Sequence, residues 1–134
     1  MAAHVKTRML VGGKAEGSVL RLAAPVSFWG GVSPETATII QADHPDCGTC
    51  ISGTVLMLPG MIGSSSSSAV LLELLYKNIA PAAIAMVDAD AILALGAVVA
   101  DEMGYPAMPM FLVPMDALQT GQYVKLAEDG TLSF

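Results

Sequence analysis

The chain has 134 residues and a formal net charge of −6 at pH 7, with only six Lys and Arg residues. A surface that binds nucleic acid needs clustered Lys and Arg to displace counterions, so this charge balance excludes nucleic acid as a partner. Apolar residues make up 54% of the chain and charged residues only 13%, which predicts an extended apolar contact with another chain.

The apolar stretches are too interrupted to span a membrane, which takes roughly 18 or more uninterrupted apolar residues. Charged residues and a proline interrupt the stretch 70–87, and two aspartates separate it from residues 91–100. The first ten residues contain no apolar run followed by a cleavage site, so we expect no secretory signal and a cytoplasmic location. We expect one domain over residues 1–134, because no repeat or linker divides the chain.

The order of apolar runs predicts an α/β fold. In the first third, short β-like runs alternate with glycine turns, which indicates curled β structure. Further along, the runs alternate as strand, helix, strand, helix, strand, which predicts right-handed crossovers onto a largely parallel sheet. The expected strands are residues 6–11, 18–23, 36–41, 53–58, 82–87, 110–113, 123–127 and 131–134, with a corner at 28–31.

Two helices are expected between the buried strands. Residues 69–77 carry apolar side chains at helical spacing, so a helix begins inside the serine run, with Ser67 or a neighbour as its N-cap. Asp90 is expected to cap a second helix that continues to about Met103. We assign Asp88 and Asp90 no chemistry, because negative charge at a helix start is favourable by itself.

Residues 63–68 read Gly-Ser-Ser-Ser-Ser-Ser and lie between an apolar strand and an apolar helix. The first N–H groups of a helix lack intrahelical partners and carry about half a positive charge, so they favour a bound anion. In open α/β folds, ligands bind at the edge of the sheet where the carboxyl ends of the strands lie, and the serine run is expected at that edge. No lysine lies in residues 59–68, which excludes the phosphate loop of nucleotide hydrolases. We predict a small carboxylate ligand here, with a plain capping loop as the alternative.

The serine run is one of five segments that together match a known family. The segments are Pro25-Val26-Ser27-Phe28-Trp29-Gly30-Gly31-Val32, His44-Pro45, Gly63-Ser64-Ser65-Ser66-Ser67-Ser68, Ala80-Pro81-Ala82-Ala83-Ile84 and Ile92-Leu93-Ala94-Leu95-Gly96-Ala97. In this order and spacing the chain resembles the small subunit of the aconitase X family, from about Gly17 to the end. The resemblance implies a swivelling β/β/α domain that packs on a large catalytic subunit, in a heterodimer or a larger assembly.

The resemblance also implies a hydro-lyase that dehydrates a small hydroxy acid, with an iron–sulfur cluster on the large subunit and none bound by this chain. One branch of the family acts on phosphomevalonate and another on cis-3-hydroxy-L-proline, which yields 1-pyrroline-2-carboxylate. A run of serines is typical of the second branch, and the lack of a lysine beside the loop independently favours an unphosphorylated substrate. A phosphomevalonate dehydratase small subunit and a non-catalytic anion-binding swivel module are the alternatives.

The resemblance assigns roles to individual residues. Ser64, the first serine, is the expected general base that removes the proton next to the substrate carboxylate. Helix N–H groups and the field of a nearby metal would stabilise its alkoxide, and the metal would act as a Lewis acid on the departing hydroxyl. Ser65 and Ser66 are expected to hold the carboxylate. The other expected substrate-binding residues are Phe28, Trp29, Gly30, Gly31 and His44.

His44, Cys47 and Cys50 form a His-x2-Cys-x2-Cys pattern, which matches three ligands of a catalytic zinc site. A turn after Pro45 explains the same spacing without a metal, and a Cys-x-x-Cys redox pair is a further alternative. An iron–sulfur cluster takes four thiolates, whereas the chain has two cysteines. Any cluster is therefore expected on the partner.

Overall fold

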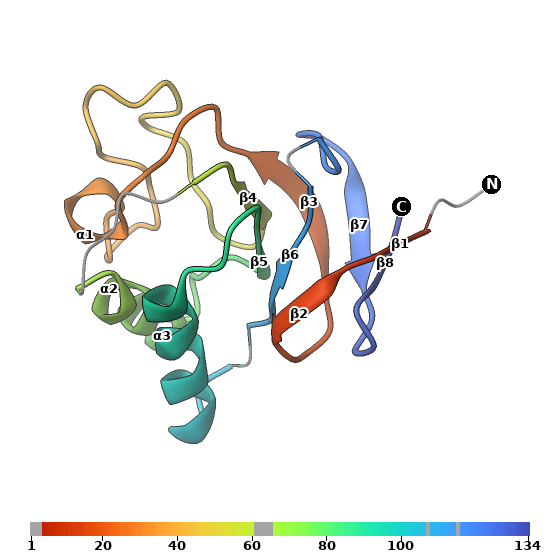
Figure 1. Cartoon of the computed structure of the whole chain (residues 1–134). Coiled ribbons are helices and arrows are strands. Elements are labelled where there is room, and N and C mark those ends of the chain that lie inside the picture. Colours follow the sequence, from red (N-terminus) through yellow and green to blue (C-terminus); the bar gives the residue numbers. More distant parts are fainter. Residues whose placement is uncertain (1–3, 61–65, 107, 115) are drawn as a thin grey trace.

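The computed structural model describes residues 4–60, 66–106, 108–114 and 116–134. Within these residues, eight strands form one mixed sheet in the order β1-β8-β7-β3-β4-β5-β6-β2, with three helices beside it (Figure 1). The strands are β1 (His4–Lys6), β2 (Arg8–Val11), β3 (Ala15–Arg21), β4 (Val55–Leu58), β5 (Ala83–Met86), β6 (Met110–Leu112), β7 (Tyr123–Leu126) and β8 (Thr131–Ser133). The helices are α1 (Phe28–Gly31), α2 (Ser67–Tyr76) and α3 (Ala91–Glu102).

The sheet closes on itself through the N-terminal segment. β1 pairs with β8 and β2 pairs with β6, at opposite ends of the strand order, yet only Thr7 separates β1 from β2 in the chain. The Thr7 N–H and hydroxyl both donate to the carbonyl oxygen of Gly130, at 2.9 and 2.8 Å. One continuous segment therefore joins the first and last strands of the sheet.

Four parallel strands, β3 to β6, form the centre of the sheet. β4 and β5 are buried along their whole length, which explains their uninterrupted apolar sequences. Successive side chains point to opposite faces: Leu56 and Leu58 pack in the core under the helices, whereas Val55 and Met57 pack in a second core with β7 and β8. The parallel pairing brings the carboxyl ends of β4 and β5 to one edge of the sheet.

α2 and α3 pack side by side on one face of the sheet (Figure 1). Gly96 of α3 permits their close approach, because a Cβ at this position would lie 3.0 Å from the carbonyl oxygen of Ser68 and 3.1 Å from its Cα. The residues that α2 and α3 bury include Val70, Leu71, Leu74, Leu75, Leu93, Ala97 and Ala100.

No helix in the described part of the chain is long and apolar enough to cross a membrane.

The predicted α/β class and the alternation of strands and helices after residue 53 are confirmed, with element ends shifted by a few residues. The curled β structure predicted at the start of the chain is also confirmed, since β1 and β2 close the sheet by pairing with strands at its two ends. The corner predicted at 28–31 is a single helical turn rather than β structure. It is kinked at Gly30, whose φ of 78° favours glycine.

The strand predicted over residues 36–41 is wrong, because this segment takes part only in isolated bridges. Ala37 has a φ of 56°, in the left-handed region that a strand residue does not adopt. Its N–H donates to the carbonyl oxygen of Ser33 at 2.9 Å, and the Ser33 hydroxyl accepts from two N–H groups of the same turn. The chain therefore turns at the point where a strand would have to continue.

Replacement of Gly96 by valine places a branched side chain against the Ser68 backbone. We expect Gly96→Val to lower the free energy of unfolding by about 1–3 kcal/mol, the usual cost of overpacking, although valine forms helices better than glycine. Urea denaturation measures the change. Val98→Ala, on the exposed side of the same helix, is the control and should stay within about 0.5 kcal/mol of the wild type. Equal stability of Gly96→Val and the wild type would contradict the close approach.

Candidate active site

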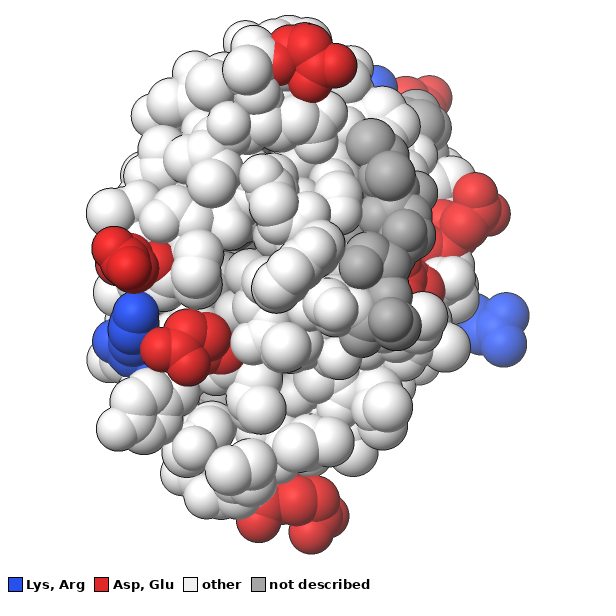
Figure 2. Space-filling model, turned by 90° about the vertical axis from the view of Figure 1, so that its left-hand side faces the viewer, with Lys and Arg blue, Asp and Glu red and all other residues white. Residues whose placement is uncertain are grey.

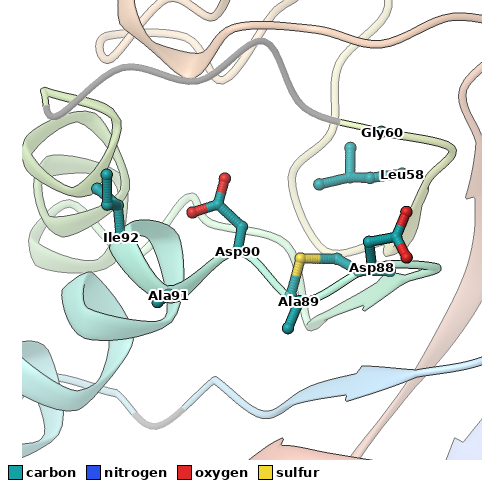
Figure 3. Close-up of a pocket in the computed structure, with 8 residues that line it drawn as sticks. Leu58, Gly60, Asp88, Ala89, Asp90, Ala91 and Ile92 are labelled. Atoms are coloured by element: carbon teal, nitrogen blue, oxygen red, sulfur yellow. The ribbon is translucent and has the colours of Figure 1, made fainter.

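A cleft of about 500 Å³ lies at the carboxyl ends of β4 and β5 (Figure 3). One side is formed by residues at the end of β4, and the other by the connection from β5 into α3. Ligands of open α/β folds bind at this edge of the sheet, so we take the cleft as the candidate site. Its described lining consists of Leu58, Gly60, Met86, Asp88, Ala89, Asp90, Ala91 and Ile92.

The described lining of the cleft is acidic. Asp88 and Asp90 contribute two carboxylates, and no Lys or Arg is among the described lining residues. Figure 3 shows the Asp90 carboxylate pointing into the open space between the end of β4 and the start of α3. Asp90 also caps α3 as predicted, because its Oδ1 accepts from the Leu93 N–H at 2.9 Å. The positive end of the helix dipole stabilises this negative charge.

α2 begins inside the serine run, as predicted, and its N-cap is the residue before Ser67. Ser66 is the N-cap, but it has helical backbone angles and its side chain makes no capping hydrogen bond to α2. Ser67 is the first helical residue. Only 1% of it is exposed, and its hydroxyl has no hydrogen-bond partner within the described part of the chain. An unsatisfied buried hydroxyl costs about 1–3 kcal/mol, so a group that accepts or donates a hydrogen bond here would be stabilising.

The expected base Ser64 and the expected carboxylate ligand Ser65 fall within 61–65, outside the described residues. The chain is described on both sides of this segment. Gly60 lines the cleft, and Ser66 begins the turn into α2. The Ser64 and Ser65 assignments therefore stay predictions.

The expected wall at residues 28–31 lies beside α2, against which α1 packs. Its members differ in exposure: Phe28 and Gly31 are buried, whereas Trp29 is 60% exposed. The ring of Pro25, just before this segment, lies 3.5 Å from the position of a Cβ on Gly60. The structure therefore brings the segment close to the cleft, although none of residues 28–31 is part of the described lining.

His44 is buried, and the backbone uses both of its ring nitrogens. Nδ1 accepts from the Asp46 N–H at 2.9 Å, so Nε2 carries the proton and donates to the carbonyl oxygen of Ala24 at 2.8 Å. The Asp46 carboxylate in turn accepts from the Ala23 N–H at 2.8 Å. These bonds tie the turn at residues 44–46 to the segment that leads into α1. The arrangement favours a positioning role for His44 over direct contact with a substrate.

Cys47 and Cys50 are exposed free thiols, and no described helix begins at either of them. A redox Cys-x-x-Cys pair uses such a helix start. The described residues contain no group of three His, Cys, Asp or Glu side chains that could hold a metal ion. Two exposed thiols do not fit an iron–sulfur cluster, which takes four. The geometry supports the turn explanation of the His-x2-Cys-x2-Cys pattern.

The fold of this chain has a counterpart among known proteins. The model of the aconitase X swivel domain matches residues 4–134. The chain belongs to the aconitase X swivel domain family. The crystal structure of Thermococcus kodakaraensis aconitase X in its holo-form superposes with a TM-score of 0.86 at 38% identity, covering 97% of this chain and 96% of that one. The predicted family and swivel fold are thereby confirmed.

Two kinds of named dehydratase resemble this swivel domain. The cis-3-hydroxy-L-proline dehydratase of Pseudomonas aeruginosa is 42% identical over 93% of this chain, which corresponds to 22% of the relative. The phosphomevalonate dehydratase small subunit of Thermococcus kodakarensis is 39% identical over 93% of this chain and 90% of the relative. The chain thus spans about a fifth of the length of the hydroxyproline dehydratase and nearly all of the phosphomevalonate subunit.

Sequence reasoning missed the position of Asp88 and Asp90 in the cleft. Both residues follow the apolar run 82–87, which was predicted to be a buried strand. Polar side chains directly after such a strand lie at the edge where ligands bind. This signal was present in the sequence, but the favourable effect of negative charge at a helix start was a sufficient explanation by itself.

Replacement of His44 by alanine leaves the Ala24 carbonyl and the Asp46 N–H without their partner. We expect His44→Ala to lower the free energy of unfolding by about 1–3 kcal/mol, the cost of unsatisfied buried polar groups. Denaturation followed by circular dichroism measures it. His4→Ala is the matched control, because His4 is exposed and its ring Nδ1 lies 3.0 Å from the exposed Ser133 hydroxyl. A His44→Ala variant as stable as this control would refute the positioning role.

Proposed function

We propose that this swivel domain is part of a hydro-lyase that dehydrates cis-3-hydroxy-L-proline to 1-pyrroline-2-carboxylate. The observation that carries the proposal is the charge of the cleft, whose described lining holds two carboxylates and no basic residue. A phosphorylated substrate would bring several negative charges to this edge without a counter-charge. Hydroxyproline brings one carboxylate and one ammonium group, and the ammonium is attracted by the acidic side of the cleft.

The serine segment supplies the chemistry in this proposal. Ser64 removes the proton from Cα of the substrate, and hydroxide leaves from the neighbouring carbon, which forms a carbon–carbon double bond. The resulting enamine isomerises to the cyclic imine, so the net change is the loss of one water. Ser65 and Ser66 hold the substrate carboxylate, and the positive end of the α2 dipole supports the bound negative charge.

The active site is shared with a large chain in this proposal. The hydroxyproline dehydratase from Pseudomonas aeruginosa is a longer chain, of which the part that matches this domain is about a fifth, and the relative from Thermococcus kodakarensis is named a small subunit. The iron–sulfur cluster expected for the family is assigned to the large chain, because Cys47 and Cys50 of this chain do not fit one.

Dehydration of phosphomevalonate is the second candidate function. Its support is the match in length, since the chain covers 90% of the Thermococcus kodakarensis small subunit. The two candidates differ in the charge of the substrate. An assay of the complex with both substrates separates them: we expect turnover of cis-3-hydroxy-L-proline, detected as pyrroline carboxylate. Turnover of phosphomevalonate alone would replace the first proposal by the second.

Removal of the Ser64 hydroxyl tests the catalytic assignment. Because a general base contributes about 10²- to 10⁴-fold to a rate, we expect Ser64→Ala to lower kcat of the complex by that factor while substrate still binds. Steady-state kinetics and calorimetric titration with substrate measure the two effects. Ser18→Ala, at an exposed position on β3, is the control and should leave kcat unchanged. Full turnover by Ser64→Ala would instead support a non-catalytic anion-binding module.

A further inference from the structure

α3 carries apolar side chains around its whole circumference. Leu93, Ala97 and Ala100 are buried against the sheet, as expected for a helix on a core. The opposite side of α3 is also apolar, and its charged residues, Asp101 and Glu102, are confined to the last turn. A helix that is apolar all round is usually buried on all sides. The exposed large apolar residues of α3 are Ile92, Leu95, Val98 and Val99, and Met103 at its C-cap is a fifth.

Four of these residues form a stripe along the outer side of α3. Ile92, Leu95, Val99 and Met103 follow one another at intervals of three or four positions, so they lie on one side of the helix. Leu95 is 58% exposed and Met103 is 54% exposed. A contiguous exposed apolar stripe of this kind marks a surface that another molecule contacts.

A shallow groove between α2 and α3 adjoins the stripe. It measures about 220 Å³, and its lining includes Ala69 and Leu72 from α2 and Leu95 and Val99 from α3. Figure 2 shows the side of the molecule that carries the helices: charged side chains lie around its margin, and a broad band between them is free of Lys, Arg, Asp and Glu. We call this surface, formed by Ala69, Leu72, Ile92, Leu95, Val99 and Met103, the α2–α3 face.

We propose that the α2–α3 face is the docking surface for the large chain of the dehydratase. The inference rests on the proposed function, because it uses a partner that completes the active site. Ile92 belongs both to the α2–α3 face and to the lining of the cleft. A chain that closes the cleft from the side of α3 therefore extends directly onto the stripe.

The chemistry of the α2–α3 face also favours the large chain as its partner. None of the six residues of the α2–α3 face is charged, so the matching surface must be apolar and must remain covered in the assembly. In the Pseudomonas aeruginosa and Hypocrea jecorina dehydratases, the part that matches this chain is 22% of the whole protein. The rest of such a protein corresponds to the large chain that this domain has to contact. A second copy of this chain would cover the stripe but would leave the cleft without the rest of its wall.

The test is the affinity of this chain for the large dehydratase chain of the same organism, with the two chains produced together and then titrated. We expect Leu95→Lys to weaken the complex at least about tenfold, because docking would bury an unpaired ammonium group. Tyr123→Lys is the matched control, since Tyr123 is 55% exposed on β7, at the opposite end of the molecule in Figure 1. Its affinity should equal that of the wild type.

Leu95→Lys and Tyr123→Lys both alter exposed positions, and thermal melting of each isolated variant verifies that it folds. Met103→Lys repeats the test one helical turn or more away and should weaken the complex in the same direction. Wild-type affinity of both α3 variants would overturn the proposal, and so would equal loss in Tyr123→Lys. An isolated chain that dimerises through Leu95, with unchanged affinity for the large chain, would overturn it in favour of a second copy.

Activity of the assembled complex separates this inference from the proposed function. If the complex is active and Leu95→Lys leaves its affinity unchanged, the docking proposal is contradicted and the proposed hydro-lyase function is not. A complex that depends on Leu95 but dehydrates neither cis-3-hydroxy-L-proline nor phosphomevalonate supports the docking surface and refutes the function.

Discussion

The parallel pairing of β4 with β5 is the constraint on which the candidate site depends. Parallel neighbours end at the same edge of a sheet, so the chain leaves both strands at one place and enters α2 and α3 from there. Leu58 and Met86, the last residues of the two strands, both line the cleft for this reason. Gly96 then sets how closely the two helices lie behind it.

The same arrangement leaves the domain with two open surfaces. One is the cleft, into which the Asp90 carboxylate points. The other is the apolar outer side of α3. The two meet at Ile92, so a single partner can satisfy both.

Local signals predicted most of the central structure. β4 and β5 are continuous apolar runs, and the Asp90 cap depends on a bond to a residue three positions on, so short-range sequence is sufficient for each. The closure of the sheet depends instead on contacts such as His4 with Ser133, which no local pattern encodes. The turn at Ala37 is stabilised by Ser33 and by bridges to neighbouring loops, and strand propensity alone therefore predicted it wrongly.

The candidate site was predictable in outline but not in detail. The serine run at a strand-to-helix boundary indicated the edge of the sheet at which the cleft lies, because this signal follows from the topology. The hydrogen bonds of the His44 ring were not predictable, since one of them reaches Ala24, which is twenty positions away in the chain. The sequence also did not predict that Trp29 is exposed while Phe28 is buried, because the difference arises from a kink in a single helical turn.

The central claim is that this domain supplies one half of an active site. The most direct test is a titration of the large chain with this chain at a fixed concentration of cis-3-hydroxy-L-proline. The account predicts no dehydration by either chain alone and a rate that rises with added swivel domain until the two are equimolar. Dehydration at the full rate by the large chain alone would contradict it.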